Sequence, residues 1–205
     1  MMRLFYSPGS CSLASHIALA EAGADYELVR TDTAAGEQRK PEYLKINPKG
    51  RVPALVTDQG ILTETPAILA YVAQAFPEAG LAPGDPWGFA RMQAFNSYLS
   101  STVHVAHAHK HRGYRWATEQ SSFADMTAKV AGNEVDCFAL IEAEMLEGPW
   151  VMGGQYTVAD GYLFTVAGWL EGDGVDIAQF PKVHDHWRRV ADRRAVRKVL
   201  AETAA

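Results

Sequence analysis

The sequence has few cysteines, no long apolar run and no excess of positive charge. Its 205 residues include two cysteines, Cys11 and Cys137, which are too few for a disulfide framework in a chain of this size. The formal net charge is −5, so the chain lacks the basic character typical of nucleic-acid-binding proteins. No stretch approaches the roughly 18 apolar residues of a membrane-spanning helix. We therefore expect neither nucleic acid nor a membrane as partner.

The composition is that of an ordinary globular protein, with 48% hydrophobic and 21% charged residues. The apolar start of the chain is interrupted at once by Ser7, Pro8 and Gly9, which leaves no apolar segment for a signal peptide. A cytoplasmic protein is the expectation.

The first 77 residues alternate strand and helix patterns. Short apolar runs predict strands, and a stripe of Leu13, Ile17 and Ala20 that ends before Gly23 predicts a helix between the first two of them. The expected elements are strands at 3–6, 26–30, 54–57 and 61–63 and helices at 12–22, 41–44 and 66–76. The order β-α-β-α-β-β-α is that of a thioredoxin-like domain.

The rest of the chain predicts helices alone. Residues 78–86 are rich in proline and glycine and are the best linker candidate, which divides the chain into domains at 1–77 and 87–205. Helical periodicity beyond the linker covers about 87–111, 123–146, 158–170 and 181–201. The expected fold class is an α+β thioredoxin-like domain followed by an all-α domain.

Cys11 stands directly before the first predicted helix. A thiol at a helix N-terminus is close to the positive end of the helix dipole, which favours the thiolate and lowers its pKa. The alternative is a small apolar filler, which free cysteines often are. Cys137 lies within an apolar run, and we expect it in the core.

Other residues of the first domain complement a peptide ligand. Pro53 begins a predicted strand, and a cis bond there would expose the backbone of Val52 to an incoming peptide. Glu64 and Thr65 precede the next helix, where backbone N–H groups hold a carboxylate and Glu64 holds an ammonium. A thiol, an open backbone edge, an anion site and a cation site together are the complement of glutathione.

The chain resembles a cytosolic glutathione transferase, and among these the bacterial beta class. The resemblance rests on segments spread over most of the chain, which are residues 6–16, 47–55, 62–64 and 156–164. It implies the two-domain fold above, in which the helical domain builds the second-substrate pocket, and a homodimer. It also implies a capping box between Thr157 and Asp160, which the Thr-x-x-Asp spacing supports independently.

The resemblance also implies roles for individual residues. Cys11 would face the glutathione sulfur, and His104 would reach the same site from the first long helix of the second domain. The residues expected to bind glutathione are Tyr6, Arg51, Val52, Pro53, Glu64 and Thr65. Val105 stands where the family usually has a lysine, and a second family lysine has no counterpart in residues 31–38, so Arg39, Lys40 and Lys49 are candidates to replace it.

A cysteine beside the glutathione sulfur allows two reactions, conjugation by the glutathione thiolate and thiol transfer by the cysteine itself. A Cys11 of low pKa would repel a glutathione thiolate, whereas it is well suited to attack a disulfide. We therefore expect thiol transfer at least as strong as conjugation. Ser12 and His104 are the candidates to assist the sulfur directly or through water, while Tyr6 corresponds to a tyrosine that is catalytic in other classes.

The segment from His104 to His111 contains a histidine face. Steps of three and four residues place His104, His107 and His111 on one side of a helix, and His107 and His111 have the helical spacing of metal ligands. No carboxylate or thiol is nearby in sequence, so we expect a cleft-lining or solvated face and no metal site. Tyr114 and Trp116 follow and would make the second-substrate pocket aromatic and basic.

The sequence thus predicts an enzyme that uses glutathione on small electrophiles or on glutathione mixed disulfides, without metal or nucleotide. The alternative is a binding protein that kept the fold and lost turnover, either as a ligand carrier or as a partner-docking domain.

Overall fold

The computed structural model describes residues 1–204. Ala205, the last residue of the predicted helical domain, lies outside the described residues. In the part of the chain that the structure describes, no helix combines the length and the apolar character needed to cross a membrane.

The first part of the chain is built on a four-stranded sheet in the order β2-β1-β3-β4. Strand β1 (Met2–Tyr6) runs parallel to β2 (Tyr26–Arg30) and antiparallel to β3 (Ala54–Thr57), which pairs with β4 (Gly60–Thr63). A parallel neighbour requires a crossover, which a helix provides between β1 and β2. This arrangement confirms the predicted thioredoxin-like fold.

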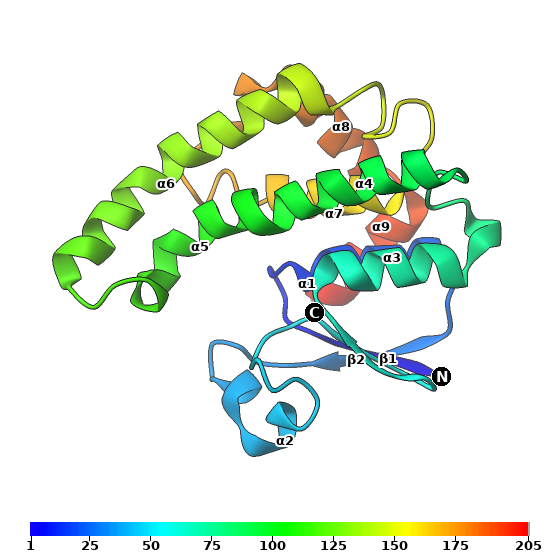
Figure 1. Cartoon of the computed structure of the whole chain (residues 1–205), viewed down its shortest axis with the longest axis horizontal. Helices are drawn as coiled ribbons and strands as arrows, with labels where there is room; N and C mark the ends of the chain where they lie inside the picture. The colour runs from blue at the N-terminus through cyan, green and yellow to red at the C-terminus, as the bar shows by residue number, and fades with distance from the viewer. Residues whose placement is uncertain (205) are drawn as a thin grey trace.

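Helices cover both faces of the sheet. Figure 1 shows α1 (Ser12–Glu21) and α3 (Thr65–Ala75) on one face and α2 (Pro41–Leu44) on the other. The sheet's Leu4 and Leu55 are fully buried in the same core cluster as side chains of α1 and α3. A short 3-10 helix, η1 (Glu37–Arg39), precedes α2.

The second part is helical and packs on the α1 and α3 side of the sheet (Figure 1). A 3-10 turn, η2 (Pro77–Ala79), leads into it, and the division of the chain near this segment stays a prediction. Its helices are α4 (Pro86–Tyr98), η3 (Leu99–Val103), α5 (His104–Arg112), η4 (Gly113–Arg115), α6 (Gln120–Leu140), η5 (Ile141–Met145), α7 (Val158–Ala167), η6 (Ile177–Gln179), α8 (Pro181–Ala191) and α9 (Arg194–Ala204).

One predicted helix is wrong, because residues 181–201 do not form a single helix. The chain breaks after α8, at Asp192 and Arg193, and resumes as α9. At the break the guanidinium of Arg193 donates to both carboxylate oxygens of Glu21, at 2.6 and 2.8 Å. It also lies 3.7 Å from the centre of the Tyr156 ring. This anchoring fixes the corner between α8 and α9 against α1.

The two parts share one core. Helix α7 is buried along its whole length and packs on α1. A Cβ added to Gly161 would lie 3.0 Å from Cγ2 of Ile17, so a glycine there permits the close approach of the two helices. The loop between β1 and α1, which contains Cys11, is thereby held against the helical part.

The predicted capping box is confirmed. One oxygen of the fully buried Asp160 accepts from the backbone N–H of Thr157, at 2.7 Å, and from its hydroxyl, at 3.1 Å. The other accepts from the Val151 N–H at 2.7 Å and lies 2.8 Å from Nε2 of His186. Asp160 thus fixes the start of α7 and joins it to α8.

Candidate functional site

Cys11 is positioned by a tight loop between β1 and α1. The Ser12 hydroxyl lies 3.1 Å from both the N and the O of Ser7 and 2.7 Å from the Ser10 hydroxyl, which closes the loop on itself. Cys11 occupies the N-cap position of α1, and its thiol donates to the carbonyl oxygen of Val52 at 3.7 Å.

The expectation of a lowered pKa for Cys11 is wrong. The residue is only 8% exposed, and burial raises the pKa of the thiol above its usual value, with the Thr65 hydroxyl and the Arg112 charge opposing part of the effect. Loss of solvation therefore outweighs the helix dipole. Cys11 is a protonated thiol at neutral pH.

The thiol lies in the wall of a small cavity. Its volume is about 110 Å³, and it is lined by Cys11, Asn47, Arg51, Val52, Pro53, Glu64, Thr65, Pro66, Ser100, His104 and Tyr162. The peptide bond between Val52 and Pro53 is cis, as expected.

Glu64 lines this small cavity and has an unusual backbone conformation. Its φ is +72°, which costs a non-glycine residue on the order of 1–3 kcal/mol. Strain of this kind is concentrated at ligand-binding sites. Glu64 also forms an ion pair with Lys49.

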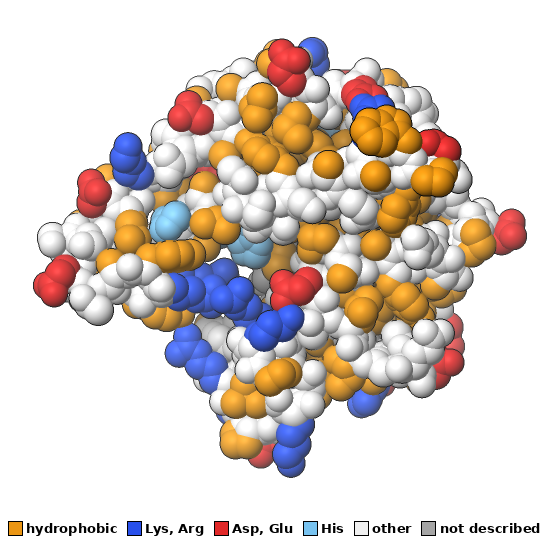
Figure 2. Space-filling model, in the orientation of Figure 1, with side chains coloured by type: hydrophobic (Ala, Val, Ile, Leu, Met, Phe, Trp, Pro, Cys, Tyr) orange, Lys and Arg blue, Asp and Glu red, His pale blue; other side chains and the backbone are white. Residues whose placement is uncertain are grey.

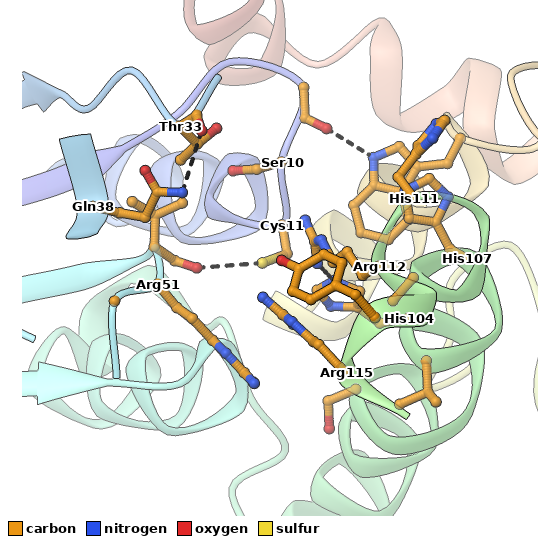
Figure 3. A pocket seen from close by; sticks show the side chains of 18 of the residues that line it. Ser10, Cys11, Thr33, Gln38, Arg51, His104, His107, His111, Arg112 and Arg115 are labelled. Carbon is orange, nitrogen blue, oxygen red and sulfur yellow. Dashed lines mark hydrogen bonds between the residues drawn. The ribbon is translucent and has the colours of Figure 1, made fainter. Parts of the chain in front are cut away.

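A second cavity of about 460 Å³ opens beside the first, between the β1–α1 loop and α5. The two cavities share Cys11, Arg51, Val52, Ser100 and His104. Figure 3 shows Arg51, Arg112 and Arg115 extending into the space around Cys11. The second cavity is also lined by Gly9, Ser10, Thr33, Gln38, Arg39, His107, His111, Tyr114, Trp116 and Trp169.

His104 is held as a neutral imidazole. Burial lowers its pKa to about 4, and the charges of Arg112, His107, Arg51 and Arg115 add to the effect. Its Nε2 lies 3.5 Å from a guanidinium nitrogen of Arg112. At neutral pH this side chain can make hydrogen bonds but does not carry a positive charge.

The predicted histidine face exists, since His104, His107 and His111 all line the larger cavity. Nδ1 of His107 lies 2.5 Å from Oδ2 of the buried Asp173, and its ring stacks on Trp169 with the centroids 4.4 Å apart. Among residues 1–204, no three His, Cys, Asp or Glu side chains are grouped as a metal ion would require. His109 points elsewhere and packs on Trp116.

Two predicted site residues lie elsewhere. Ser12 is fully buried and lines neither cavity, and its hydroxyl is hydrogen-bonded to the backbone of Ser7 within the loop. The geometry therefore contradicts direct assistance to the sulfur. Tyr6 also lines neither cavity and belongs to the core, beside His16. The other predicted residues meet at the two cavities; they are Cys11, His104, Arg51, Val52, Pro53, Glu64 and Thr65.

The three candidates to replace the family lysine, Arg39, Lys40 and Lys49, differ in their partners and in whether they face the larger cavity. Lys40 pairs with Glu37, and Lys49 pairs with Glu64. Arg39 lines the larger cavity and donates to the Tyr114 hydroxyl at 2.9 Å. Arg39 is therefore the candidate that faces the cavity.

Sequence reasoning missed Arg112, Arg115, Trp169 and Asp173. The two arginines belong to the basic run at 109–115, which was a visible signal. Trp169 donates to the Gly9 carbonyl at 3.1 Å and so joins α7's end to the β1–α1 loop. No local sequence pattern predicts this contact, because 160 residues separate the two partners.

Comparisons with known proteins agree with this geometry. Residues 1–74 match the model of the glutathione S-transferase N-terminal domain, and residues 135–193 match that of the C-terminal domain. The chain is 30% identical over 203 residues to glutathione S-transferase GstA of Escherichia coli O157:H7, covering 98% of each chain.

Solved structures extend the likeness. A glutathione transferase homologue from Sulfitobacter, solved with bound glutathione, is 50% identical with a TM-score of 0.96, covering 98% of each chain. A beta-class glutathione S-transferase of Sphingomonas chungbukensis is 34% identical with a TM-score of 0.86, again covering 98% of each chain. This chain belongs to the glutathione S-transferase family.

Proposed function

We propose that the protein is a glutathione transferase that uses glutathione as co-substrate and joins its sulfur to small electrophiles. One observation carries this proposal: a narrow cavity and a wider one meet at Cys11 and His104. A binding site for the peptide and a binding site for the second substrate then adjoin at the reacting sulfur, and a transfer between two substrates needs them held close together.

The narrow cavity and the adjoining part of the larger one together offer groups for each part of glutathione. The backbone of Val52 pairs with the cysteinyl unit, which places the sulfur beside Cys11. The N-terminus of α3 at Thr65 holds the γ-glutamyl carboxylate, and Glu64 holds the ammonium. Arg51 and Arg39 are at hand for the glycine carboxylate.

The raised pKa of Cys11 changes the expected chemistry. In conjugation with an aryl halide, the glutathione thiol first releases its proton to solvent. The thiolate then forms a C–S bond while the C–halogen bond breaks and the halide leaves with the bonding pair. When glutathione binds, a protonated Cys11 turns its single S–H from the Val52 carbonyl to that thiolate and keeps its own proton, so it stabilises the nucleophile instead of repelling it. Attack of Cys11 on a mixed disulfide needs the scarcer thiolate and becomes the side activity.

The test combines binding and turnover. Calorimetric titration with glutathione should show saturable binding, and glutathione-dependent conjugation of chlorodinitrobenzene should exceed the reduction of a small mixed disulfide. Glutathione binding without either activity would establish the ligand-carrier alternative and overturn the transferase.

We also propose the beta class, a homodimer and a cytoplasmic location. Cys11 and His104 lie together, as the beta-class resemblance implies, and both cysteines are free thiols, as expected in a reducing compartment. The proposal of a homodimer rests on the family resemblance. Light scattering during size exclusion tests the dimer, and a monomer mass at micromolar concentration would contradict it.

A further inference from the structure

We propose that the second substrate is an electrophile carrying a carboxylate or a similar anionic group, and that Arg112 and Arg115 bind this group. The inference rests on the proposed transferase function and names the class of electrophile that the larger cavity accepts. The chain as a whole is acidic, with a net charge of −5, so a basic cavity is a local feature and not a reflection of composition.

The larger cavity concentrates positive charge. Arg39, Arg51, Arg112 and Arg115 line it, and of the described residues no aspartate or glutamate does so. Figure 2 shows Lys and Arg side chains gathered at a hollow in the molecular face, next to histidine. These arginines come from both parts of the chain, so their convergence is a product of the fold.

The four arginines have no carboxylate partners within residues 1–204. Arg112 is half-buried, and both burial and the charge of Arg115 lower its pKa. Two carboxylates near this cavity are already paired: Asp173 with His107 and Lys110, and Glu64 of the narrow cavity with Lys49. Like charges held together without a counter-ion are stabilised when an anion binds between them.

Glutathione does not account for Arg112 and Arg115. In the proposed binding mode its carboxylates are held by Thr65 in the narrow cavity and by Arg51 and Arg39, which belong to the thioredoxin-like part of the chain, although Arg39 lines only the larger cavity. Arg112 and Arg115 line the larger cavity and not the narrow one. Arg112 ends α5 and Arg115 ends the η4 turn, so both belong to the helical part of the chain, which the resemblance assigns to the second substrate.

The same cavity offers aromatic surface beside the guanidiniums. Trp169 and Trp116 both line it. A flat, unsaturated body packs on such rings while its anionic group reaches an arginine, and guanidiniums bind carboxylates in a planar, two-pronged manner. The anionic group itself does not react, since the bond changes are those of the C–S and C–halogen bonds described above.

The experiment compares a chlorodinitrobenzoate with its methyl ester, which differ in charge and share the reacting carbon. Each enzymatic kcat/KM is divided by the uncatalysed rate constant with glutathione, which removes their different intrinsic reactivity. We expect the normalised value to favour the carboxylate by about tenfold or more. Arg115→Gln and Arg112→Gln should each reduce this preference severalfold, and the double variant should abolish it.

Arg197→Gln is the matched control, because Arg197 is exposed on α9, lines neither cavity and changes the net charge equally. Arg115 is exposed, so its replacement does not endanger folding. Binding of the unreactive dinitrobenzoate and its ester to the glutathione-loaded protein gives a readout independent of turnover. Equal affinities for the two, or a preference that survives the double variant, would overturn the inference. Absence of glutathione binding would instead overturn the proposed function.

Discussion

At the scale of single residues, the site depends on how burial changes ionisation. Cys11 has the position of a reactive thiolate, at a helix N-terminus, but its thiol is covered by the fold and donates to Val52. The helix dipole stabilises a charge by about 0.3–1 kcal/mol, whereas full burial of a charged group shifts a pKa by several units. The larger effect decides that Cys11 is a hydrogen-bond donor.

A substitution pair at Cys11 separates donation from covalent attack. Cys11→Ser keeps an O–H donor, so conjugation of chlorodinitrobenzene should stay within about tenfold of the parent rate. Cys11→Ala removes the donor and should cost more, on the order of 10²-fold. Reduction of a mixed disulfide should be lost in both variants, because neither has a sulfur nucleophile. Steady-state assays of both reactions check this, and a parent-like conjugation rate in Cys11→Ala would contradict the donor role.

His104 predicts a pH dependence. Since burial and the surrounding arginines lower its pKa to about 4, it stays neutral from pH 5 to 8, and His104 should contribute no ionisation near pH 6.5 to the rate profile. In the unfolded chain the ring titrates near 6.5, so the unfolded state binds more protons between pH 6.5 and 4. Stability is therefore lost as the pH falls through that window. NMR titration of the His104 ring checks the first point, and a midpoint near 6.5 would refute it.

At the scale of elements, the start of α7 determines whether the helical part folds. Asp160 is fully buried and holds Thr157, Val151 and His186 at once. Asp160→Ala leaves these donors without an acceptor and should lower the free energy of unfolding by about 3–5 kcal/mol. Thr157→Ala, which leaves the Asp160 carboxylate bound to the other groups, should cost about 1–2 kcal/mol. Urea unfolding of both variants measures the difference, and equal costs would contradict the central role of Asp160.

At the scale of the whole molecule, charge is separated between an acidic surface and a basic cavity. A negative overall charge repels anionic substrates at long range, while Arg39, Arg51, Arg112 and Arg115 attract them near the cavity. The Debye length shrinks from about 30 Å at 0.01 M salt to about 8 Å at 0.15 M. A substrate at the cavity is close to the four arginines and to no lining carboxylate, so the attraction there exceeds the repulsion and loses more when salt screens both.

We therefore expect kcat/KM for glutathione to fall severalfold as ionic strength rises from 0.01 to about 0.3 M. Arg51→Gln should flatten this dependence, because Arg51 faces both cavities. Arg197→Gln should preserve it. An identical salt dependence in both variants would show that the cavity arginines do not guide the substrate.

Much of this protein was determined by its sequence alone. The periodicity of the first 77 residues, the turn residues and the Thr157–Asp160 spacing set the elements and their order, because these signals act over a few residues. The position of Cys11 before α1, and of His104 on a cavity-facing helix, followed from the same local patterns together with the family resemblance.

Tertiary structure decided the chemistry. Burial of Cys11 had a larger effect on its pKa than its position at the helix N-terminus. Burial also places Ser12 and Tyr6 away from both cavities. The convergence of Arg39 and Arg51 with Arg112 and Arg115, and the contact of Trp169 with Gly9, join segments far apart in the chain. Solvation and charge depend on what surrounds a group in space, so no local pattern could specify them.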